Sequence, residues 1–122
     1  MLIAILTFLF LGGSSSVALD YLGDARGNAK DVIAHDARRD SAVDTIKAME
    51  KMTKDFEKQR KKNARALVKA WKRYEDDYDA IDAVWQTQFD AVDEYYGGLI
   101  DKREDLKQSV TREEWSRIFP PE

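Results

Sequence analysis

This chain has no cysteine, a single histidine and only two prolines. Without cysteine it can form neither disulfide bonds nor a cysteine-ligated zinc site, and one histidine rules out sites that need two imidazoles. Both prolines, Pro120 and Pro121, lie at the end of the 122 residues, so residues 1–119 lack the strongest helix breaker. A chain of this length forms one domain at most.

Charged residues are abundant, at 35% of the chain, but the two signs are unevenly distributed. Residues 45–74 contain eleven basic and three acidic side chains, whereas residues 75–122 contain five basic and fourteen acidic ones. A basic stretch alone would suggest a nucleic-acid or anionic-lipid site. Because an acidic stretch of similar size follows it, we expect the two segments to pair with each other, within the fold or across an oligomer. We therefore expect no nucleic-acid binding.

The beginning of the chain is apolar, and residues 1–19 carry no charged side chain. We predict a membrane-spanning helix over residues 1–22, because about 20 apolar residues cross the hydrocarbon core. The predicted anchor side chains are Leu2, Ile3, Ile5, Leu6, Phe8, Leu9, Phe10 and Leu11. A cleaved secretory signal is the first alternative, since a Gly/Ser stretch leads to a small-x-small site at residues 16–18, although the usual basic start is missing. A buried helix of a soluble fold is the second alternative.

Two features of the sequence bear on the orientation of such an anchor, and they favour opposite orientations. Lys and Arg occur after the apolar segment and not before it, which by the positive-inside rule places the rest of the chain in the cytoplasm. The signal-like features favour export instead. We expect a single-pass membrane protein whose body lies outside the cytoplasm.

The rest of the chain has the composition of long helices. Neither Gly nor Pro occurs between residues 28 and 96, and good helix formers dominate. We predict a helical stalk over residues 23–41, extending past an antiparallel helical hairpin over residues 42–108. The turn is expected near residues 74–79, where the charge changes sign and several Asp residues suit the start of a new helix.

The apolar residues of the predicted hairpin follow a seven-residue spacing in its second half, from Tyr78 to Leu106. This spacing is typical of a coiled coil or of an ordinary amphipathic core helix. In the first half the stripe is interrupted at Arg60 and Asn63, which we interpret as a solvated face. The alternative is a buried polar contact that sets the register of the two helices. The predicted hairpin core consists of Phe56, Leu67, Trp71, Trp85, Val92, Leu99 and Leu106.

Residues 109–122 are predicted to form a short capping helix and a tail. Thr111 is followed at the third position by Glu114, the pattern of a capping box, and two prolines end the segment. Its apolar side chains are Trp115, Ile118 and Phe119. They either fold back on the hairpin or dock on a partner, since Trp is common both in cores and at binding hot spots.

The sequence contains no recognisable catalytic or metal site. His35 shares a helix face with Asp31 but has no second imidazole beside it, and the acidic clusters lack the glycine of a calcium loop. Phosphate-loop, nucleophile-elbow and dinucleotide motifs are all missing. We therefore expect no metal, no cofactor and no enzymatic activity.

These features predict an all-α protein with an N-terminal membrane or signal helix, an antiparallel hairpin with coiled-coil-like packing and a short C-terminal helix. The leading hypothesis is a small membrane-anchored protein with a structural or partner-binding role. Its expected partners are membrane lipid and either a second protein or further copies of itself. The alternative is an exported soluble helical binding protein, chaperone-like or stress-related, that is released by signal cleavage.

Overall fold

The computed structural model describes residues 15–34, 36–73 and 78–121, and these ranges contain four helices and no strand. The helices are α2 (Ser15–Val32), α3 (Ala37–Trp71), α4 (Tyr78–Ser109) and α5 (Arg112–Ile118). The all-α prediction is confirmed for this part of the chain. The predicted anchor residues Leu2–Leu11, His35 and most of the predicted turn lie outside it.

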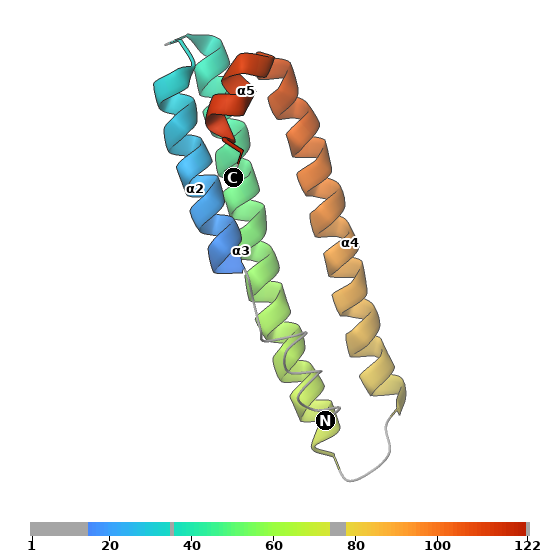
Figure 1. Ribbon diagram of the computed structural model, residues 1–122. Helices are drawn as coiled ribbons and strands as arrows, with labels where there is room; N and C mark the ends of the chain where they lie inside the picture. The colour runs from blue at the N-terminus through green and yellow to red at the C-terminus, as the bar shows by residue number, and fades with distance from the viewer. Residues whose placement is uncertain (1–14, 35, 74–77, 122) are drawn as a thin grey trace.

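α3 and α4 lie side by side and antiparallel (Figure 1). The chain reverses between Trp71, where α3 ends, and Tyr78, where α4 begins. α2 packs antiparallel against the half of α3 that is remote from this reversal, and α5 folds from the end of α4 onto α2. One half of the molecule is therefore a helical bundle, and the other half is a two-helix hairpin.

The helix starts follow local rules of capping. Asp36 is the N-cap of α3, and its carboxylate accepts hydrogen bonds from the backbone N–H groups of Arg38 and Arg39 at 2.9 and 3.3 Å. At α5 the capping box is confirmed. The Thr111 hydroxyl accepts from the Glu114 N–H at 3.1 Å, and the Glu114 carboxylate accepts from the Thr111 N–H at 2.8 Å.

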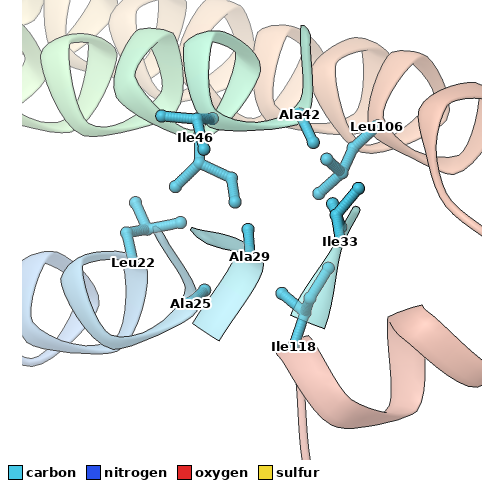
Figure 2. Close-up of a cluster of buried hydrophobic side chains, with 9 residues drawn as sticks. Leu22, Ala25, Ala29, Ile33, Ala42, Ile46, Leu106 and Ile118 are labelled. Atoms are coloured by element: carbon cyan, nitrogen blue, oxygen red, sulfur yellow. The ribbon is translucent and has the colours of Figure 1, made fainter. Parts of the chain in front are cut away.

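The main core lies where all four helices meet (Figure 2). α2 contributes small residues to it, so that its backbone approaches α3 closely, while Ile46, Leu106 and Ile118 are the largest apolar side chains that are fully buried. The cluster consists of Leu22, Ala25, Ala29, Ile33, Ala42, Val43, Ile46, Leu106 and Ile118.

The prediction of a stalk over residues 23–41 is wrong. α2 ends at Val32, and α3 starts in the opposite direction at Ala37. The physical reason is burial: an extended stalk would leave the apolar face of α2 in water, whereas the return onto α3 buries Ala25 and Ala29.

Residues 15–22, which we assigned to the predicted membrane helix, are also part of α2. Leu22 is buried in the main core rather than facing lipid. Within the described ranges, no helix combines the length and apolar composition that crossing a bilayer requires.

The predicted hairpin core is only partly buried. Leu67 and Ala64 form a second small cluster against Ile81, Val84 and Trp85. Phe56 stacks on Tyr95 with ring centroids 4.4 Å apart, Val92 and Leu99 are half-buried, and Leu106 belongs to the main core.

Trp71 is not a core residue, because 39% of it is exposed. It is the last residue of α3, and the facing end of α4 offers Tyr78, which is itself 67% exposed. The seven-residue stripe therefore reaches the interior only from Trp85 onward.

The interruption at Arg60 and Asn63 is not a solvated face, since both side chains are buried. Arg60 pairs with Glu57 one turn earlier, through its Nε at 3.0 Å and through a second, shorter bond. Asn63 bonds across the interface to Gln88. Buried polar groups require such partners, so this part of α3 faces α4 with polar rather than apolar side chains.

The predicted charge pairing between the basic and acidic segments is not what joins α3 to α4. The ion pairs among the described residues lie within one helix, or link α3 to α2 and α5, as in Arg26–Glu50 at 2.8 Å and Arg38–Glu114 at 2.9 Å. None of them joins a basic residue of α3 to a carboxylate of α4. The α3 cations largely face solvent, where a pair contributes little and holding two long side chains costs entropy.

Candidate binding groove

A hollow of about 530 Å³ lies between α2, α4 and α5 on the bundle half of the molecule. α2 and α4 both pack on α3, and α5 lies at one end of the space that they border. Its volume falls in the range of small-molecule sites, which are commonly 300–1,000 Å³. We call this hollow the apolar groove. Its lining is Ala18, Tyr21, Leu22, Met49, Tyr95, Tyr96, Leu99, Ile100, Arg103, Leu106, Trp115 and Phe119.

The aromatic side chains at the α5 end of the groove pack against one another. Tyr21 of α2 stacks on Phe119 with ring centroids 5.8 Å apart, and Phe119 meets Trp115 at 4.7 Å. This chain of rings connects α2 to α5. It gives that end of the groove a wall of flat apolar surfaces, which suits an apolar ligand of extended shape.

The opposite wall is one face of α4. Tyr96 and Ile100 are 59% and 61% exposed, one helical turn apart, and both line the groove beside the half-buried Leu99. Large apolar side chains exposed side by side in a concave surface are uncommon in a chain with 35% charged residues. This wall is therefore the most marked apolar exposure of the bundle half.

A second, smaller hollow of about 240 Å³ adjoins the apolar groove. The two share Arg103 and Trp115, and the Arg103 guanidinium lies 5.2 Å from the centre of the Trp115 ring, in cation–π contact. We call this hollow the basic pocket. Its lining is Arg103, Lys107, Val110, Thr111, Arg112 and Trp115.

α5 is held over the groove by polar contacts on its outer side. Asn28 of α2 donates from Nδ2 to the Ile118 carbonyl at 3.0 Å. Arg38 donates to the Glu114 carboxylate at 2.9 Å. The Thr111 N–H bond and then the Arg38 pair lower the pKa of Glu114, and the same pair raises the pKa of Arg38. These contacts fix the positions of Trp115 and Phe119.

The residues predicted to dock a partner separate into two groups. Trp115 and Phe119 are partly buried and line the groove. Ile118 points the other way into the main core and is 1% exposed, so it cannot contact a partner. Their position fits the expectation that the tail folds back, but not a freely exposed tail.

Sequence reasoning did not identify Tyr96, Ile100 and Arg103 as candidate site residues, and it included Tyr21 in the predicted membrane helix over residues 1–22. The sequence does carry one signal for them. The apolar stripe of α4 contains the neighbouring pairs of large side chains Tyr95-Tyr96 and Leu99-Ile100, one helical turn apart. A stripe wider than one packing partner can cover leaves part of it free.

The described residues contain no group of three or more His, Cys, Asp or Glu side chains placed to hold a metal ion. In comparisons with known proteins, no protein-family model, curated protein or solved structure matches this chain. The candidate site therefore rests on the geometry of the groove.

Proposed function

We propose that this chain is a small non-catalytic binding protein, attached to a membrane by its apolar first residues, whose recognition site is the apolar groove. The main observation in support of this proposal is the concave row of exposed apolar side chains formed by Tyr21, Tyr96 and Ile100. A concave apolar surface with a few polar groups is the usual form of a binding site. The absence of catalytic motifs from the sequence supports a binding rather than an enzymatic role.

The position of the groove supports attachment near a membrane. α2 starts at Ser15, four residues after the apolar run Leu2–Leu11 ends, and its first turns supply Ala18 and Tyr21 to the groove wall. If the run enters lipid, the groove opens within a few residues of the bilayer. In the exported orientation that the signal-like features favour, the bundle would lie outside the cytoplasm.

The alternative is an exported soluble binding protein, cleaved after residues 16–18. One observation favours it: the α2 residues of the main core start at Leu22, so the bundle keeps its buried side chains after such a cleavage. Only Ala18 would be lost from the groove lining.

Site-specific cross-linking of the full chain in its native membranes tests the binding role. A photoreactive phenylalanine replaces Tyr96 in the groove or, as the matched control, Tyr78 on the same helix, which is similarly exposed but lies outside the groove. We expect adducts at position 96 and none above background at position 78. Equal labelling at the two positions would refute the groove as the recognition site. An adduct between two copies would identify the partner as the chain itself.

The membrane part is tested by washing the same membranes with carbonate and sequencing the N-terminus. We expect the intact chain in the pellet. A soluble chain that starts at Leu19 would show that the exported alternative is correct. The cross-linking result is independent of this outcome.

A further inference from the structure

We propose that the ligand of the apolar groove is a long-chain fatty acid, with its alkyl chain in the groove and its carboxylate in the basic pocket. The inference rests on the proposed function, because it names the ligand of the same site. It follows from three observations: the two hollows are adjacent, their chemistry differs, and they share the lining residues Arg103 and Trp115.

The shape of the apolar groove suits one alkyl chain. Its volume of about 530 Å³ lies in the range of a single small-molecule site. Its lining is a row of aliphatic and aromatic side chains from Ala18 to Phe119, with Arg103 as the only charged residue. A flat bilayer surface would require these side chains to protrude, whereas they line a concavity.

The basic pocket supplies the complementary charge for an anionic head group. Arg103, Lys107 and Arg112 line it, and no carboxylate belongs to the lining of either hollow. The nearest acidic group in contact is Glu104, 3.3 Å from Arg103 and 3.8 Å from Lys107. These two pairs are about half exposed and therefore weak, so they leave the cations able to bind another carboxylate.

Arg103 marks the boundary at which the ligand changes from apolar to charged. Its guanidinium lies over the Trp115 ring, and both side chains line both hollows. A guanidinium has five N–H donors in a fork that fits a carboxylate, and one face of it can still stack on a ring. Arg103 is therefore placed to bind the carboxylate while the alkyl chain continues along α4 toward Ile100 and Tyr96.

The test is quenching of Trp115 by a fatty acid brominated on its alkyl chain, in the full chain with Trp71→Phe and Trp85→Phe. We expect saturable one-to-one quenching, and an affinity that rises about four-fold with each further methylene that the groove buries. A chain that keeps only Trp71, at the far end of α3, reports quenching away from the groove and should show none that saturates.

The head group is tested by charge reversal and by a neutral analogue. Arg103→Glu should weaken binding about ten-fold or more, since a charge-assisted bond is replaced by repulsion. Arg117→Glu on α5 is the matched control, because Arg117 is exposed and lines neither hollow, and it should bind as the parent does. The brominated fatty alcohol should also bind at least ten-fold more weakly than the acid.

Two results would overturn the fatty-acid proposal. One is equal binding of alcohol and acid, or equal binding by the Arg103 and Arg117 variants. The other is the lack of saturable quenching of Trp115. If quenching fails while Tyr96 still cross-links to a protein, the groove is a protein-docking site, and the proposed function stands with a different ligand. If both fail, the groove is not a recognition site.

Discussion

Asn63 of α3 donates a hydrogen bond from its Nδ2 to the Oε1 of Gln88 in α4, at 2.8 Å, and both side chains are almost fully buried. A third amide takes part, because Gln59 donates to the Asn63 Oδ1 at 2.8 Å. Ten residues earlier along α3, Thr53 and Tyr95 join their hydroxyl groups at 2.7 Å. The long interface between α3 and α4 is therefore aligned by polar contacts as well as by apolar packing, which fixes the register of the two helices.

Asn63→Ala should lower the free energy of unfolding by about 1–3 kcal/mol, because it leaves the buried Gln88 amide without its partner. Asn63→Leu combined with Gln88→Leu should recover most of that loss, since neither buried polar group then remains unpaired. Urea unfolding followed by circular dichroism measures both. If the double variant is less stable than Asn63→Ala, the Asn63–Gln88 pair stabilises the fold by more than the removal of an unpaired buried group.

The main core should respond to truncation far more than the hairpin surface. Ile46→Ala should cost about 2–5 kcal/mol, since Ile46 is 0% exposed among the side chains of α2, α4 and α5. Ile100→Ala, the same substitution at a position that is 61% exposed, should change stability by no more than about 0.5 kcal/mol. Thermal or urea unfolding of the two variants gives the comparison. Equal losses would contradict the location of the core.

The sequence predicted those parts of the fold that depend on neighbouring residues. The absence of Gly and Pro indicated long helices, the change of charge sign located the reversal between Trp71 and Tyr78, and the Thr111–Glu114 pattern predicted the cap of α5. Each of these signals depends on a few neighbouring residues, so it can be interpreted without knowledge of how the helices pack against one another.

The parts that were predicted wrongly depend on residues far apart in the chain. α2 returns to α3 through alanines, whose short side chains give only a weak periodic pattern, so residues 23–41 were assigned to a free stalk. A Cβ added at Gly23 or Gly27 would have open space around it, and the buried small residues of α2 are Ala25 and Ala29 instead. Asn63 looked solvated because its partner Gln88 lies 25 residues later.

The candidate groove was the least predictable feature. It exists only because α5 folds onto α2 and brings Trp115 and Phe119 opposite Tyr96. The composition of the tail made Trp115 and Phe119 candidates for docking. It did not predict the direction in which each side chain points. Ile118, one residue before Phe119, faces the core.

Gly97 and Gly98 lie inside α4, which continues through them to Ser109, and they should differ in their tolerance of a side chain. Nothing lies within 4 Å of a Cβ added at Gly97, so Gly97→Ala should raise stability by about 0.5–1 kcal/mol through helix propensity. A Cβ at Gly98 would overlap the methyl group of Met52 on α3. Gly98→Ala should therefore gain less than Gly97→Ala, because the Met52 methyl group, at the flexible end of its side chain, must shift to make room.

Thermal unfolding of the two alanine variants side by side separates the effects, since the propensity gain is the same in both. The Met52→Ala background provides the control. There the clash is removed, and Gly98→Ala should become as favourable as Gly97→Ala. An equal gain from both substitutions in the parent chain would show that Met52 moves aside at no cost.

The position of α5 should depend on pH through Glu114. The Thr111 N–H bond and the pair with Arg38 lower the pKa of this carboxyl, so the folded chain binds its proton less readily than the unfolded chain does. Its contribution to stability is therefore fully present above the ordinary glutamate pKa of about 4.3 and is lost as the pH falls below that value.

We expect α5 to loosen from α2 during acidification, before the α3–α4 hairpin unfolds, because Glu114 is the acidic group shared by the cap and the link to α3. In a chain without the other two tryptophans, Trp115 fluorescence should shift toward that of exposed indole as the pH falls below about 4. Glu114→Gln should flatten this transition and loosen α5 already at neutral pH, because the amide neither pairs with Arg38 as an anion nor carries the titrating proton. Glu113→Gln, on the same helix turn without these contacts, is the matched control and should leave the transition unchanged. A transition of the same size in the Glu114 variant would assign the acid sensitivity to other carboxyl groups.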